Sequence, residues 1–138
     1  ILKGTEKIWD SSIANIGILW VAERDRDKLD RYFEAVFPPF WRRELDIEDV
    51  EVVKSCLIEA GIDANGFNDF QSGEGRALHD DLQSQFHPHG IYGVPTFVVG
   101  DEVLFGREHI PYLRWHLSGQ KGPAPDIAYE IAYETESC

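Results

Sequence analysis

The sequence predicts an α/β protein that is mostly helical, with a β-hairpin and one more helix near its C-terminal end. Apolar residues recur at helical spacing in several segments between residues 9 and 87. Two short β-branched runs follow, and the loop Gly100-Asp101 separates them. A two-residue loop of this kind is a strong hairpin signal. Two strands alone are marginally stable in water, so we expect further strands from before Ile1 or from another chain.

The first two helices are expected over residues 9–25 and after the charged run at residues 23–27. N-cap candidates for the first helix are Asp10, Ser11 and Ser12. The apolar stripe of the second helix has i, i+4, i+7, i+8 spacing and consists of Leu29, Phe33, Val36 and Phe37. We expect Pro38-Pro39 to interrupt this helix, because the residue before a proline avoids the α region. Phe40-Trp41 would then continue the apolar surface beyond the break.

Three more helical segments precede the hairpin. Asp46-Ile47-Glu48-Asp49 places acidic residues in the first turn of the third helix, where the macrodipole favours them, and Gly61 marks its end. The inward face of this helix is expected to hold Val50, Val53, Leu57 and Ile58. Cys56 lies in the same helix and is expected to be a small core residue. Helices over residues 63–71 and 74–87 follow.

The C-terminal part is expected to contain strands Thr96–Val99 and Glu102–Phe105, then a helix over residues 107–117. The inward residues of that helix would be Ile110, Leu113 and Leu117. We therefore expect three regions, which are a helical region at 1–89, the end of an α/β domain at 90–117, and a tail at 118–138. The tail alternates apolar and other residues, which indicates an extended strand or a packed arm, at Ile127, Tyr129, Ile131 and Tyr133.

Composition and charge narrow the classes of partner. The chain has 138 residues and a formal net charge of −12, which argues against nucleic acid and against anionic membrane surfaces. No window approaches the length of apolar sequence that a transmembrane helix needs. The residues after Ile1 include charged side chains and no apolar run, so no secretory signal is expected. The sequence does not begin with Met, which suggests that it starts inside a longer product. Two cysteines, Cys56 and Cys138, form no CxxC pair, which favours a cytoplasmic location.

The segment Gly90–Val99 carries the most specific signal. Pro95 stands directly before a predicted strand, a position that proline tolerates because it cannot donate to the ladder. The turn-rich approach and the hairpin that follows predict a cis bond between Val94 and Pro95. A cis bond there would offer the backbone N–H and C=O of Val94 to a ligand, as a peptide-binding edge does.

These motifs resemble a known family. Gly93-Val94-Pro95-Thr96-Phe97, the hairpin and Phe105–Ile110 resemble the C-terminal half of a DsbA-type thioredoxin fold. Phe40–Ile47, the next helix and Glu59–Asp63 are similar to the all-helical insertion of 2-hydroxychromene-2-carboxylate isomerases and kappa-class glutathione transferases. The resemblance covers Ser12 to Leu117. It implies an α/β, thioredoxin-like fold of the DsbA type with a large all-helical insertion.

The resemblance also implies site residues and glutathione as cosubstrate. Val94, before Pro95, would pair its backbone with the cysteinyl part of glutathione. Gly106, Arg107 and Glu108 would hold the γ-glutamyl carboxylate at a helix N-terminus, where free N–H groups attract an anion. Glu stands at 108 where the family favours Asp, and His at 109 replaces the usual Arg.

The family's catalytic Ser, or the CxxC of its oxidoreductase relatives, belongs to a first βα unit that this sequence does not show. No catalytic residue is therefore predicted here. The function implied is that of a glutathione-dependent isomerase or transferase acting on small aromatic or electrophilic compounds. Two alternatives stay open, which are a DsbA-type thiol–disulfide oxidoreductase and a non-catalytic interaction module that lacks the active-site unit.

Two further expectations concern ligands and assembly. Most aromatic residues of the helices are expected in the core, whereas Phe40 and Trp41 are candidates for a substrate pocket. No metal site is predicted, because His87-Pro88-His89 lacks partners at ligand spacing. A homodimer is expected, since the family is commonly dimeric and an incomplete sheet leaves an edge to pair.

Overall fold

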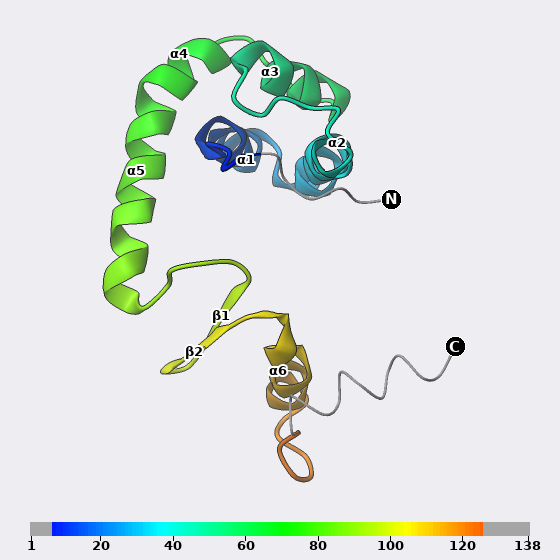
Figure 1. The fold of residues 1–138 in the computed structure, drawn as a ribbon, viewed down its shortest axis with the longest axis vertical. Coiled ribbons are helices and arrows are strands. Elements are labelled where there is room, and N and C mark those ends of the chain that lie inside the picture. The colour runs from blue at the N-terminus through cyan, green and yellow to red at the C-terminus, as the bar shows by residue number, and fades with distance from the viewer. Residues whose placement is uncertain (1–6, 126–138) are drawn as a thin grey trace. The chain divides into compact units, whose positions relative to one another are not determined.

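The computed structural model describes residues 7–125, and Figure 1 shows their fold. The chain divides into two compact units, residues 1–83 and 84–138, and the boundary falls inside the fifth helix. The helices are α1 (Ser12–Arg24), α2 (Leu29–Trp41), α3 (Val50–Glu59), α4 (Phe67–Ser72), α5 (Glu74–Phe86) and α6 (Ile110–Leu117). The strands are β1 (Thr96–Val99) and β2 (Glu102–Phe105), and 3-10 turns lie at Arg26–Lys28, His87–His89 and Arg107–His109. This order confirms the predicted series of helices, hairpin and last helix.

Helices α1, α2 and α3 contact one another and form the core of the first unit. Its largest fully buried side chains include Tyr32, Phe67, Ile16 and Leu57. Trp20 ties α4 to this core, because its ring packs edge-on against Phe67 at 5.6 Å between centroids. The indole N–H of Trp20 also donates a hydrogen bond of 2.9 Å to the carbonyl of Asp63. None of the helices in the described residues has the length and apolar character needed to cross a membrane.

The crossing of α1 and α2 is close because Gly17 lies directly over Tyr32. A Cβ atom at residue 17 would collide with the phenol ring and hydroxyl of Tyr32. That hydroxyl donates a buried hydrogen bond of 2.9 Å to the carbonyl of Ala14. Burial raises the pKa of Tyr32 well above its usual value. The two helices therefore depend on one small residue and one satisfied phenol at their contact.

The expectation that Pro38-Pro39 interrupts the second helix is wrong, because α2 continues to Trp41. Pro39 lacks the N–H that would bond to the carbonyl of Ala35 four residues earlier. The thiol of Cys56, on α3, donates to this carbonyl instead, at 3.6 Å. The prolines also lie close to the helix end, where few intrahelical bonds remain to be lost. Cys56 is buried, which confirms its predicted place in the core.

The second helix ends at a left-handed residue that is not glycine. Arg43 has φ of 62°, and its N–H donates to the carbonyl of Phe40 at 2.9 Å. The N–H of Glu44 reaches back to the carbonyl of Pro39 at 3.0 Å. Together these two bonds form a Schellman motif, which satisfies the last carbonyls of the helix.

Several details of the third helix differ from the expectation. Asp49 caps α3 by accepting from the N–H of Glu51 at 2.8 Å, and Gly61, with φ of 80°, follows its end as predicted. Ile58 was expected inward but is 64% exposed. Cys56 takes its place on the buried face beside Val53 and Leu57. Cys56 and not Ile58 is buried because the inward face of α3 follows i, i+3, i+4 spacing from Val53.

The hairpin of the second unit has the predicted strand bounds. β1 and β2 are antiparallel, with Thr96 opposite Phe105 and Val99 opposite Glu102. The last helix, α6, begins at Ile110, after the 3-10 turn, and not at residue 107. Leu117, expected inward, is 80% exposed. Residues 1–6 and 126–138 lie outside the described residues, and with them the alternating tail positions and Cys138.

Candidate functional site

The loop before β1 presents the backbone of Val94. The peptide bond between Val94 and Pro95 is cis, the isomer that the sequence leads us to expect. Val94 is 90% exposed, and no backbone hydrogen bond among the described residues uses its N–H or C=O. The hydroxyl of Thr96 donates to the carbonyl of Gly93, which fixes the loop from the strand side. The main chain of Val94 is therefore accessible to an incoming ligand.

The turn into the last helix lies next to this loop. The N–H of Gly106 donates a hydrogen bond of 2.9 Å to the carbonyl of Pro95, so the structure brings these two predicted site residues together. Gly106 has φ of 105° and ψ of 153°, a conformation that is essentially restricted to glycine. The carboxylate of Glu108 folds back against Gly106, where a Cβ atom would collide with it. Arg107 is exposed in the same turn.

Aromatic contacts hold the loop against the end of β2. The ring of Tyr92 lies 4.9 Å from that of Phe105, centroid to centroid. Gly93 allows this approach, since a Cβ atom there would press into the ring of Phe105. His109 has a buried Nδ1 without a hydrogen-bond partner among the described residues. The loop, the end of β2 and the Gly106–His109 turn thus form one local structure within the second unit.

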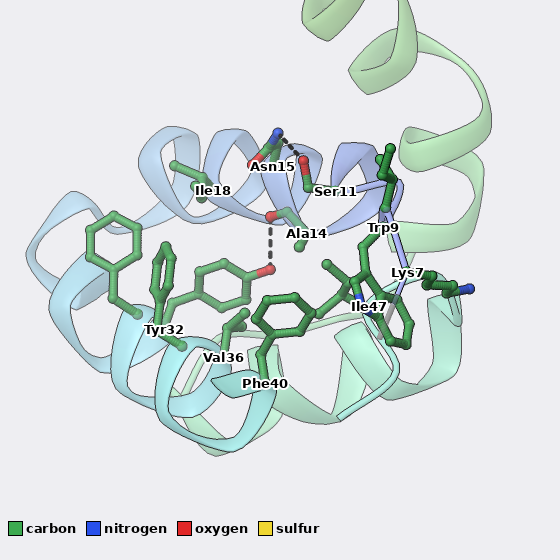
Figure 2. Close-up of a pocket in the computed structure, with 13 residues that line it drawn as sticks. Lys7, Trp9, Ser11, Ala14, Asn15, Ile18, Tyr32, Val36, Phe40 and Ile47 are labelled. Carbon is green, nitrogen blue, oxygen red and sulfur yellow. Dashed lines mark hydrogen bonds between the residues drawn. The ribbon is translucent and has the colours of Figure 1, made fainter. Parts of the chain in front are cut away.

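A separate pocket lies in the first unit, between the N-terminal segment, α1 and α2. It has a volume of about 320 Å³ and 13 lining residues, which Figure 2 draws. Figure 2 shows Tyr32, Val36 and Phe40 pointing from α2 toward α1. Aromatic and aliphatic side chains form its walls, and Ser11, the N-cap of α1, and Asn15 of α1 supply polar groups.

Of the two predicted pocket residues, Phe40 lines this pocket and Trp41 does not. Trp41 is 38% exposed, and its ring lies 5.2 Å from that of Phe40. Sequence reasoning missed Trp9, Phe33 and Phe37 as lining residues. The signal for Phe33 and Phe37 was present in the sequence, because residues 33, 37 and 40 share one face of a helix that continues through the prolines.

Cys56 is the one cysteine in the described residues, and it is not an exposed nucleophile. Burial raises the pKa of its thiol, and the nearby carboxylate of Glu59 adds to this effect. A thiol that is protonated and buried is inert toward disulfide exchange. Within residues 7–125, no group of three or more His, Cys, Asp or Glu side chains is arranged to hold a metal ion.

Comparison with known proteins decides the family. The family model of the DSBA-like thioredoxin domain matches residues 2–118. The chain belongs to the DsbA-like thioredoxin domain family. This membership confirms the predicted fold class, because the match covers the helical region, the proline loop, the hairpin and α6.

Two curated relatives of this DsbA-like chain are distant. The 2-hydroxychromene-2-carboxylate isomerase of Sphingobium xenophagum is 23% identical over 95 residues, which are 68% of this chain and 49% of that protein. The uncharacterized protein YwbO of Bacillus subtilis (strain 168) is 28% identical over 88 residues, which are 60% of this chain and 42% of that protein. The chain therefore spans about half the length, or less, of the curated relatives that it matches.

Proposed function

We propose that this chain carries the glutathione-binding part of a glutathione-dependent isomerase or transferase that acts on small aromatic or electrophilic compounds. One observation carries the proposal. Val94 is exposed, and no backbone hydrogen bond among the described residues uses its N–H or C=O. The Gly106–Pro95 hydrogen bond joins its loop to the turn that bears Glu108. A peptide-like ligand needs both features, which are a free strand edge and a place for its charged end.

Each part of glutathione has a matching group in the loop at Val94 or in the Arg107–His109 turn. The cysteinyl residue has one N–H and one C=O, which pair with the free C=O and N–H of Val94 as in an added strand. The γ-glutamyl end has a carboxylate and an ammonium group. The N–H groups of Arg107 and Glu108, which make no backbone hydrogen bond to any described residue, suit the carboxylate. The exposed side chain of Glu108 suits the ammonium.

Such binding would place the thiol of glutathione for reaction. A lowered thiol pKa raises the fraction of thiolate, which is the attacking species. In an isomerase the thiolate adds to the substrate and leaves again after bond rotation, and in a transferase it stays attached. The isomerase relative supports the first reaction, and the chromene ring in its name supports a small substrate with an aromatic ring, which we extend to this chain as part of the proposal. A second copy of the chain is the proposed protein partner.

Calorimetric titration of the full chain with S-methylglutathione tests the proposal, because this ligand cannot form disulfides. We expect saturable binding, and a loss of about tenfold in affinity for Glu108→Gln, which removes a charge-assisted bond. Asp101→Asn is the matched control, since it removes an exposed carboxylate from the hairpin loop and should leave binding unchanged. No heat at millimolar ligand, or equal affinity in both variants and the parent chain, would overturn the proposal.

A further inference from the structure

The walls of the pocket in the first unit contain two pairs of aromatic rings. Trp9 and Phe40 meet edge-to-face, with centroids 5.7 Å apart and an interplanar angle of 80°. Phe33 and Phe37 form a second edge-to-face pair at 5.8 Å. Phe37 is 50% exposed, so apolar surface at this pocket lies open to solvent. A volume of about 320 Å³ lies at the lower end of the range for small-molecule sites, roughly 300–1,000 Å³, and suits one or two rings.

Two uncharged polar groups of the pocket come from Ser11, the N-cap of α1, and from Asn15, one turn further along. The side-chain amide of Asn15 donates to the hydroxyl oxygen of Ser11 at 3.3 Å, the upper dashed line in Figure 2. An asparagine amide has two donor hydrogens and one acceptor oxygen, and a serine hydroxyl donates once. Among the described residues, no other hydrogen bond uses the second Asn15 N–H, the Asn15 oxygen or the Ser11 O–H, so these groups can serve a ligand. Those groups match a phenol hydroxyl or a carbonyl oxygen.

The charge of Lys7, the cation of the lining, is already neutralised. Its Nζ donates to Glu48 at 2.6 Å and lies 4.2 Å from the ring centroid of Trp9. Glu48 also accepts from the N–H of Asp10 at 2.9 Å, which holds the carboxylate in place. The hydrogen bond from Lys7 and that backbone bond lower the pKa of Glu48, so its carboxylate stays ionised at neutral pH. A carboxylate ligand would lose hydration in an apolar pocket without gaining a free cation.

We propose that this pocket binds a neutral, flat aromatic compound of one or two rings that carries a hydroxyl or carbonyl oxygen, and that it discriminates against aromatic carboxylates. The ring packs between the aromatic walls, and its oxygen bonds to Ser11 and Asn15. The net charge of −12 acts in the same direction, because it disfavours anions over the whole surface. That this compound is the acceptor for glutathione rests on the proposed function. That the pocket binds the compound does not rest on it.

Titration of the full chain with 1-naphthol and 1-naphthoate at pH 7, without glutathione, tests this inference. The two probes share a ring system, and only the second is charged. We expect 1-naphthol to bind at least about tenfold more tightly, and to shift the side-chain amide resonances of Asn15. Asn15→Ala should weaken binding by about fivefold, whereas Asn65→Ala, the same change at an exposed position outside the pocket, should not.

Three outcomes would overturn the inference. They are equal or tighter binding of 1-naphthoate, no binding of either probe, and binding of 1-naphthol that Asn15→Ala leaves unchanged. None of them depends on glutathione, which is absent from the titration. The proposed function fails in a different experiment, the titration with S-methylglutathione, so the two failures are distinguishable.

Discussion

The N–H of Gly106 donates a hydrogen bond of 2.9 Å to the carbonyl oxygen of Pro95. This bond extends the β1–β2 ladder by one step, because Thr96 and Phe105 are the last paired residues. It connects the loop that exposes Val94 to the turn that carries Glu108. The two parts of the proposed glutathione site are therefore held together by the hairpin itself.

Gly106→Ala should disrupt this connection. The backbone at φ of 105° and ψ of 153° excludes a Cβ atom, so the variant should lose about 1–3 kcal/mol of local stability. Hydrogen exchange of the β1 and β2 amides measures the loss. Gly100→Asn is the control, since φ of 60° in the hairpin loop is one that Asn adopts readily. Equal protection in Gly106→Ala and the parent chain would contradict the account of this turn.

Gly17→Ala should force α1 and α2 apart at Tyr32. We expect a cost of about 1–3 kcal/mol in the free energy of unfolding, because the new methyl group overlaps the phenol. Tyr32→Phe removes the hydroxyl that the methyl group meets first, so the double variant should be destabilised by less than the sum of the single effects. Urea unfolding followed at the indole resonance of Trp20 measures the stability of the two single variants and of the double variant. Additive effects would show that the two residues do not interact.

The stability of the first unit should fall at alkaline pH. Burial raises the pKa of Tyr32 above its ordinary value of 10.0, so the folded state keeps a proton that the unfolded chain loses. This contribution is complete below pH 10 and decreases as pH rises above it. Tyr32→Phe should flatten the stability profile in that window, whereas Tyr92→Phe, at an exposed position in the other unit, should not. A profile that Tyr32→Phe leaves unchanged would contradict this assignment.

Cys56 should resist alkylation in the folded chain. Its thiol is buried and has a raised pKa, so iodoacetamide at pH 8 should modify it at least about tenfold more slowly than in urea. The experiment uses a Cys138→Ser variant and reads the Cys56 peptide by mass spectrometry. Equal rates in buffer and in urea would show that α2 and α3 do not enclose the thiol.

The sequence predicted the hairpin and its bounds because short-range chemistry determines them. Gly100-Asp101 sets the loop, and the β-branched runs on either side set the strands. The continuation of α2 through Pro38-Pro39 was not predictable locally. It depends on Cys56 of α3, a residue far along the chain, whose thiol bonds to the carbonyl that Pro39 leaves free.

The contrast between features set by local sequence and features set by tertiary contacts also applies to the candidate site. The sequence indicated Val94, Pro95 and the Gly106–Glu108 turn through a motif, and the structure places Pro95 and Gly106 in direct contact. The wall of the pocket in the first unit escaped prediction for a tertiary reason. Trp9 precedes α1 in the chain and reaches Phe40 only through folding, so no local spacing links them.

The most direct test of the central claim is a residue-resolved NMR titration of the labelled full chain with S-methylglutathione. The account predicts that the amide proton of Val94 moves downfield as it begins to donate a hydrogen bond. The amides of Arg107 and Glu108 should shift with the same dissociation constant. Saturable binding that leaves the Val94 amide unchanged, or that shifts only residues outside this loop and turn, would contradict the account.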